Sequence, residues 1–299
     1  MNAPAQCRRE GRPSLRATAL LALLPLLASC LSITVDPRAL LSSPDGTVRV
    51  RSLPCEARQG ADPEADAATT ANALDPRAIR VLTWNINKEQ DAAWERDLAR
   101  FVEESDIVLL QEVALRRPLR DMAERSRLRW IMASSFMFGA EDVGVLTATR
   151  VAPTEVCTLR AFEPLIRLPK SAVIAWFRLT GGGRMLAVAN IHAINFSSVD
   201  AYRSQLEALA AALAGHRGPI VFAGDFNTWN DARTGVLHEI ADRLGLIEIT
   251  FVTDTRSLFF GRQLDHIFVR GLEMIESSSI PVTSSDHNPV AATLRVTER

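Results

Sequence analysis

Residues 220–227 read IVFAGDFN, and this stretch carries the pattern on which the fold prediction rests. The apolar residues 220–222 predict a short buried strand bounded by a glycine. Asp225 and Asn227 follow at the end of the strand, and period-two geometry places their side chains on the same face. The stretch therefore predicts a buried strand that delivers a carboxylate and an amide to the loop beyond it.

The same arrangement recurs along the chain, where apolar runs end in polar residues. Six such ends carry Asn85, Gln111 with Glu112, Asn190 with His192 and Asn195, Asp225 with Asn227, Asp265, and Asp286 with His287. A single Asn or Asp at a strand end is more often a turn or a helix cap than a catalyst, but six together indicate one shared site. Asp265 and His266 point to opposite faces of their strand, so only one of them can face that site.

Strands and helices alternate over about 220 residues. Apolar runs predict strands at residues 79–84, 107–110, 143–148, 172–179, 185–191, 220–222, 264–269 and 290–296. Two amphipathic stretches, after Asp91 and after Asp200, predict helices. The fold class is therefore α/β or α+β in packed layers, with one catalytic domain at residues 79–299.

The amino terminus has the features of a secretory signal. Four arginines in residues 1–16 precede an almost purely apolar run at residues 17–28, which is too short to span a bilayer. Residues 27–30 read LASC and resemble a bacterial lipobox, so we expect cleavage after residue 29 and a lipid on Cys30. This predicts an anchored protein facing the periplasm, at the outer membrane. The alternatives are an uncleaved anchor, or a start assigned too far upstream in a cytoplasmic protein.

Residues 30–78 form an extension rich in Pro, Ala, Asp and Ser, which reads as a linker. Within it, the alternating residues 48–51 suggest one short strand. In an oxidising compartment Cys55 could pair with Cys157, and two free buried thiols are the alternative.

The charge balance argues against non-specific binding of nucleic acid. The chain has 34 basic and 35 acidic residues, and loss of residues 1–29 leaves a net charge of −4. A strongly basic face is what such binding requires. The sequence also has no His-Glu-x-x-His or paired Cys-x-x-Cys zinc pattern and no Walker A loop.

The polar strand ends, taken in order, resemble the endonuclease/exonuclease/phosphatase superfamily, which has the fold of DNase I. Gly-Asp-Phe-Asn at residues 224–227 and Ser-Asp-His-Asn-Pro at residues 285–289 are the most specific elements, and the resemblance covers residues 79–295. Residues 165–172 and 190–196 are similar to the bacterial YafD-like subgroup. The resemblance implies a four-layer α/β/β/α sandwich with two mixed sheets face to face.

The resemblance also implies roles for individual residues. Glu112 matches the metal-binding Glu of the family, with Asn85 supporting it and Asp286 completing a site for Mg²⁺, or alternatively Mn²⁺. For Glu112, a carboxylate at the start of a helix over residues 114–125 is the other interpretation. Asp225 matches the residue that orients or deprotonates the attacking water, and His287 with Asp265 is the competing base. Asn227 would hold a phosphate oxygen.

A further set would contact the substrate. His192 and Asn195 match a pair that contacts the scissile phosphate, with His192 donating toward the leaving oxygen. Lys170, which with Lys88 makes up all the lysine of the chain, could bind a substrate phosphate, or could be a solvated loop residue. His216, His238 and His266 are expected to be structural or surface residues.

The sequence therefore predicts a monomeric, Mg²⁺-dependent phosphoesterase. Phosphodiesters of nucleic acid, nucleotides or phospholipids are the candidate substrates, and the membrane is a partner through Cys30. Two alternatives remain open: a non-catalytic binding protein on the same fold, and a cytoplasmic endonuclease.

Overall fold

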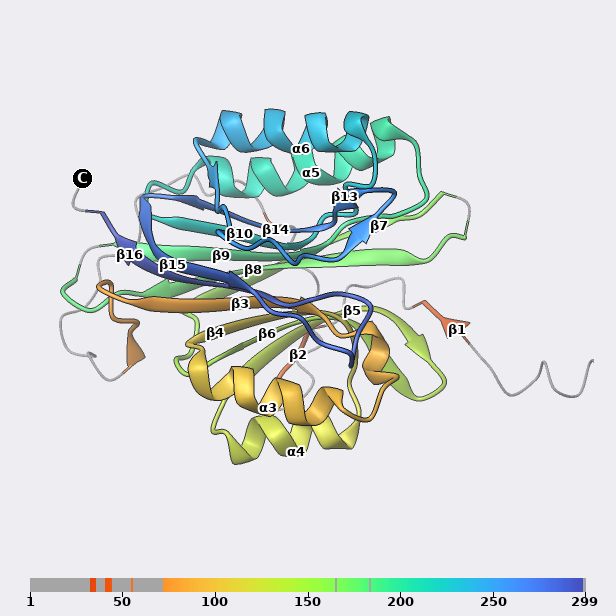
Figure 1. Cartoon of the computed structure of the whole chain (residues 1–299), viewed down its shortest axis with the longest axis horizontal. Helices are drawn as coiled ribbons and strands as arrows, with labels where there is room; N and C mark the ends of the chain where they lie inside the picture. The colour runs from red at the N-terminus through yellow and green to blue at the C-terminus, as the bar shows by residue number, and fades with distance from the viewer. Residues whose placement is uncertain are drawn as a thin grey trace, which may run out of the picture.

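The computed structural model describes residues 33–35, 41–44, 55, 72–164, 166–182 and 184–297. Two β-sheets lie between two layers of helices, with α5 and α6 outside one sheet and α3 and α4 outside the other (Figure 1). The predicted sandwich of two mixed sheets is confirmed. Among the described residues, no helix is both long and apolar enough to cross a membrane.

The first sheet has eight strands in the order β1-β5-β6-β4-β3-β16-β15, with β2 also paired to β5. Its parallel pair is β3 with β4, which brings Asn85 beside Gln111 at the same edge. The strands are β1 (Ile33–Thr34), β2 (Leu41–Ser42), β3 (Ile79–Asn85), β4 (Ile107–Ala114), β5 (Arg129–Phe138), β6 (Glu141–Thr149), β15 (Leu272–Ser279) and β16 (Val290–Val296).

The second sheet has six strands in the order β11-β14-β10-β9-β8-β7. Its parallel pair is β9 with β10, which places His192 beside Asp225, and the antiparallel β14 places Asp265 on the other side of Asp225. The strands are β7 (Glu155–Phe162), β8 (Pro169–Arg178), β9 (Met185–His192), β10 (Ile220–Asp225), β11 (Ile247–Glu248) and β14 (Asp265–Arg270), and a separate hairpin joins β12 (Leu258–Phe259) to β13 (Arg262–Gln263).

The helices bury one face each and are capped where the sequence provides a capping side chain. Ser198 accepts a hydrogen bond from the N–H of Ala201 at the start of α5, and Asn230 accepts one from Arg233 at the start of α6. The helices are α3 (Trp94–Glu104), α4 (Arg117–Arg125), α5 (Val199–Ala214) and α6 (Asp231–Leu244), with a short 3₁₀ turn η3 at Asn87–Glu89.

The apolar core has three layers, one between the sheets and one under each helix pair. Val81, Leu109, Phe177 and Val221 are among the side chains that meet between the sheets, each with almost no exposed surface. Burial on both faces explains why these strands read as near-continuous apolar runs. The sheets are thereby fixed face to face, and their polar ends meet at one edge.

The sequence prediction omitted several elements of this domain, among them the short strands β11, β12 and β13. The longer elements that it omitted are β5, β7, β15 and α6. Most of β15 is exposed, so its sequence shows no apolar alternation. The extension before residue 79 is more than a linker, because β1 and β2 join the first sheet. Cys55 and Cys157 form a disulfide that closes a long loop. The signal, Cys30 and the suggested strand at residues 48–51 lie outside the described residues.

Candidate active site

Asp225 lies at the centre of the polar cluster formed by the strand ends. Its Oδ2 accepts a hydrogen bond from the Asn85 amide at 3.0 Å and lies 3.5 Å from Nε2 of His192, while its Oδ1 accepts the backbone N–H of Asn227 at 2.9 Å. The carboxylate is almost fully buried, and burial raises its pKa. Asn85 comes from one sheet, and Asp225 with His192 comes from the other. The structure thus brings polar strand ends of both sheets together.

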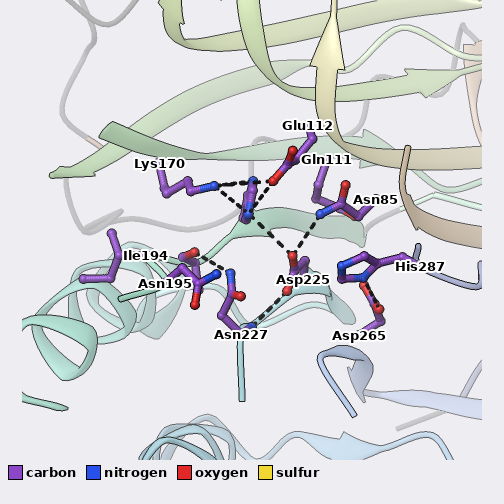
Figure 2. Close-up of polar contacts among 12 residues, drawn as sticks. Asn85, Gln111, Glu112, Lys170, Ile194, Asn195, Asp225, Asn227, Asp265 and His287 are labelled. Atoms are coloured by element: carbon purple, nitrogen blue, oxygen red, sulfur yellow. Dashed lines mark hydrogen bonds and ion pairs between the residues drawn. The ribbon is translucent and has the colours of Figure 1, made fainter. Parts of the chain in front are cut away.

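His287 and Asp265 form a hydrogen-bonded pair on one side of Asp225 (Figure 2). Nδ1 of His287 lies 2.7 Å from Oδ2 of Asp265, and the backbone carbonyl of His287 accepts a hydrogen bond from the indole of Trp84. Burial opposes a charge on the ring, but Asp265 and Asp225 outweigh it and raise the pKa of His287 to about 10. Because Asp265 holds Nδ1, Nε2 is the ring nitrogen left to meet a substrate.

The other side of Asp225 holds both lysines of the chain. Lys88 pairs with Oε2 of Glu112, and Lys170 lies 3.6 Å from Oε1. Nζ of Lys170 also lies 2.9 Å from Nε2 of His192. Burial, together with the neighbouring Lys170, lowers the pKa of His192 well below its usual value, so this imidazole is neutral.

Two of the site residues have a backbone conformation that non-glycine residues seldom adopt. Glu112 has a φ of 52° and Asn227 a φ of 51°. Glu112 lies where the pairing of β4 with β6 shifts register, between Leu110 and Val113. Such strain persists only where the surrounding structure imposes it, and it is typical of functional sites.

The Asn227 loop is held by contacts that the sequence did not reveal. The Asn227 amide donates to the carbonyl of Ala193, and the fully buried Arg233 donates from Nε to the Asn227 carbonyl at 2.7 Å. Arg233 also pairs with the Ile194 carbonyl and stacks over the Tyr202 ring. This arginine therefore joins the two loops that carry Asn195 and Asn227.

Asn195 and Asn190 have different surroundings, although both flank His192. Asn195 lies at the site, with its backbone N–H bonded to the buried carboxylate of Glu163. Asn190 faces between the sheets, where its Oδ1 accepts a hydrogen bond from Gln111 at 2.7 Å. Gln111 and Asn190 therefore tie the sheets together behind the site.

His266 and Asp265 point to opposite sides of β14, as strand alternation predicted. The ring of His266 contacts Glu248 through Nδ1 and Thr228 through Nε2, both at 2.7 Å. Arg256 pairs with Glu248 and donates to the carbonyl of Asp265. His216 contacts the carbonyl of Pro219 and His238 contacts Glu248, both away from the cluster around Asp225.

A cavity of about 240 Å³ opens beside the lysines. Its polar wall includes Lys88, Glu112, Lys170 and His192. Its apolar lining is formed by Phe136, Val143, Ile166, Leu168 and Phe196. The arrangement can bind an anionic group beside an apolar one.

The donors near Glu112 fit a hard divalent cation in their chemistry. Within the described part of the chain no three His, Cys, Asp or Glu side chains gather as a metal site. However, Mg²⁺ needs only one or two protein carboxylates, with water and substrate oxygens supplying the rest. Asp286 is exposed, and its charge acts on Lys88. In this structure the positive charge beside Glu112 and near Asp286 is therefore the ammonium group of Lys88.

Comparisons with known proteins agree with this fold. The model of the endonuclease/exonuclease/phosphatase family matches residues 82–287. A UPF0294 protein of Yersinia enterocolitica is 40% identical over 233 residues, covering 78% of this chain and 87% of its own length. One from Klebsiella pneumoniae is 39% identical over 241 residues, covering 80% and 90%. These relatives belong to the YafD-like subgroup named above.

Solved structures share the architecture at low sequence identity. The human Nocturnin catalytic domain with bound sulfate has a TM-score of 0.59 and 18% identity, with 75% of this chain and 96% of that one covered. ANGEL2, a 2′,3′-cyclic phosphatase in complex with adenosine-2′,3′-vanadate, has a TM-score of 0.59 and 15% identity, with 75% and 97% covered. At this level of identity the similarity concerns the fold.

Proposed function

The chain belongs to the endonuclease/exonuclease/phosphatase family, and on that premise we propose that it is a metal-dependent phosphoesterase that hydrolyses phosphodiesters. The observation that carries the proposal is the convergence on Asp225. Asn85, His192 and Asn227 all lie within 3.5 Å of its carboxylate, and the His287–Asp265 pair lies beside it. A binding protein would not require this set of titratable groups.

The substrate phosphate is held by donors from both sides of Asp225. Lys170 and the Asn195 loop meet it from one side, and Nε2 of His287 from the other. These donors offset the charge that develops on the phosphoryl oxygens in the transition state. Asn227 is fixed by its own hydrogen bonds and so presents its loop in one orientation.

Hydrolysis requires a base that removes a proton from the attacking water. The new bond joins the water oxygen to phosphorus, the ester bond to the leaving oxygen breaks, and the leaving oxygen takes up a proton. Asp225 is placed to accept the water proton, and Nε2 of His287 can do so only after the ring has lost the proton that its raised pKa retains. On the leaving side, the ring N–H of His192 would donate to the leaving oxygen. The pH–rate profile separates the two bases, because removing the base abolishes the acidic limb of the profile.

Glu112, Asn85 and Asp286 would hold the divalent cation. When bound, Mg²⁺ or Mn²⁺ neutralises phosphate charge and polarises the ester. A carboxylate, an amide oxygen and a second exposed carboxylate suit such a cation, since it retains several waters. The proposed location is the cell envelope, with the chain anchored through Cys30 and facing the periplasm.

The first test measures hydrolysis of bis(4-nitrophenyl) phosphate, plasmid DNA and RNA, with Mg²⁺ and with EDTA. We expect turnover that requires metal and that falls about a thousandfold in the Asp225→Asn variant. Asp231→Asn, on the first turn of α6, is the matched control and should leave turnover unchanged. Metal-independent turnover, or activity in Asp225→Asn within tenfold of wild type, would contradict the proposal.

A further inference from the structure

Exposed apolar side chains gather at the mouth of the cavity beside the lysines. Ile166 and Phe196 line that cavity, and yet 59% and 55% of their surfaces are exposed. Large exposed apolar side chains that adjoin one another mark a surface for binding, whereas isolated ones carry no such meaning.

On one side they continue as a row of aromatic rings. The ring centroids of Phe196 and Trp229 lie 6.3 Å apart, and those of Trp229 and Phe260 lie 6.2 Å apart. The ring centroids of Phe260 and Phe259 lie 4.5 Å apart. The row ends at the tip of the β12–β13 hairpin, where Phe260 is 76% exposed and Leu258 is also exposed. Three consecutive apolar residues at a hairpin tip cannot be buried by their own two-stranded ribbon.

On the other side they continue along the edge of the first sheet. Phe136 lines the cavity, and Phe138 two residues later is exposed and pairs with the exposed Ile33 of β1. β1 and the β12–β13 hairpin lie toward the same end of the sandwich (Figure 1). The apolar rim thus consists of Ile33, Phe138, Ile166, Phe196, Leu258, Phe259 and Phe260.

We propose that the apolar rim docks on a lipid bilayer, so that the site opens toward the membrane surface. Aromatic and aliphatic side chains around a cationic centre suit the boundary between acyl chains and phosphate headgroups. Lys88 and Lys170 lie inside the rim, where a phosphate at that boundary would meet them. The inference names the substrate class of the proposed function, a phosphoester lipid, and in that respect rests on it.

The rim is less suited to a nucleic acid. Single strands bind where stacking rings alternate with a basic groove that follows the backbone. Ile33, Ile166 and Leu258 are aliphatic and offer no stacking face, and the chain as a whole carries a net charge of −1. A nucleic acid therefore stands as a competing outcome of the test.

The expected anchor lies close to the rim in the sequence. Cys30 precedes Ile33 by three residues, and three residues of extended chain span at most about 10 Å. A lipid on Cys30 would therefore hold the edge formed by Ile33 and Phe138 near the bilayer. The expected anchor and the rim place the same end of the molecule against the membrane.

The docking is tested with a thiol-reactive, polarity-sensitive dye at Phe260→Cys in the full chain, expressed with its own signal. Vesicles of phosphatidylethanolamine and phosphatidylglycerol should shift the emission to shorter wavelength. The control is Ile247→Cys, an exposed residue that pairs with Val269, at the opposite end of β14 from Asp265. Unsubstituted chain gives the background from other thiols. An equal response at both positions overturns the proposal.

Two other occupants give distinct signals, and each would overturn the proposal. A shift with single-stranded DNA but not with vesicles identifies a nucleic-acid platform. A shift that grows with protein concentration in the absence of vesicles identifies a second copy of the chain.

The substrate class is tested by the ratio of phosphatidylglycerol hydrolysis in vesicles to hydrolysis of bis(4-nitrophenyl) phosphate. The double variant Phe259→Ser/Phe260→Ser should lower this ratio about tenfold, and Ile247→Ser should not. Hydrolysis of the soluble ester without hydrolysis of vesicle lipid overturns the lipid class. Failure of both hydrolyses refutes the proposed function, while the dye measurement still decides the docking.

Discussion

A buried histidine lies on each side of Asp225, and the pKa values of the two rings shift in opposite directions. His192 shares its side with Lys170, and burial together with this cation lowers the pKa of the ring. His287 shares its side with Asp265, and the carboxylates raise the pKa of its ring to about 10 despite burial. Burial lowers the pKa of both rings, and at His287 the neighbouring carboxylates outweigh this effect, whereas at His192 the cation of Lys170 adds to it. One side therefore presents cationic lysines, and the other presents a cationic imidazole.

The largest expected effect comes from removing the charged histidine. His287→Ala should lower kcat about a thousandfold on bis(4-nitrophenyl) phosphate, because it removes a donor or base at the reacting phosphate. His238→Ala, a half-exposed histidine away from the site, serves as the control. The melting temperature should stay nearly constant. A tenfold loss or less would remove His287 from the mechanism.

The second effect concerns stability on the lysine side, where Glu89 follows Lys88. Burial raises the pKa of Glu89 to about 7, against the opposing influence of Arg116 and the Ala114 N–H. Since this pKa lies above the ordinary value of 4.5, the favourable contribution is present below pH 4.5 and is lost as the pH rises through 7. Glu89 alone should lower the free energy of unfolding by about 2–3 kcal/mol between pH 5 and pH 8.

Urea unfolding of Glu89→Gln at both pH values checks this expectation. The variant should lose the contribution of Glu89 to the pH dependence and be more stable than wild type at pH 8. Glu104→Gln, an exposed residue at the end of α3, should keep the wild-type pH dependence. Identical pH dependence in Glu89→Gln and wild type would show that the buried carboxyl is not the source.

A smaller effect should follow the loss of the lysine that lies between Glu112 and His192. Lys170→Met keeps the length of the side chain but removes its charge, so it should raise KM about tenfold or more while changing kcat less. Arg178→Met, at the other end of β8, is the matched control. An unchanged KM would place the substrate phosphate on the His287 side alone.

The smallest effect concerns competition for Glu112. Lys88→Met should tighten Mg²⁺ binding several-fold, because the ammonium and the metal compete for one carboxylate. Glu112→Gln should weaken it, and titration calorimetry without substrate measures both. Equal Mg²⁺ affinity in wild type and Glu112→Gln would place the metal elsewhere.

Prediction from sequence worked best where alternation or a strand end carried the signal. Asp225, Asn227 and Asp265 could be found because each ends or begins a buried run, and alternation separated Asp265 from His266. Lys88 was recognised only as a rare residue, and Arg233 was not recognised, because neither belongs to a periodic pattern. Their roles depend on partners 24 and 39 residues away.

The sequence by itself determined the class of fold and pointed to the polar strand ends that form the candidate site, because buried strands and polar strand ends are local patterns with a fixed period. It also showed that Lys88 and Lys170 are the two lysines of the chain and that lipobox-like residues precede Ile33. Only the tertiary structure decided that Asn190 binds Gln111 between the sheets, that Lys170 lies beside His192, and that the pKa values of His192 and His287 shift in opposite directions. Those properties arise from charges and hydrogen-bond donors that two different sheets bring within a few ångströms, and spacing along one chain does not encode such distances.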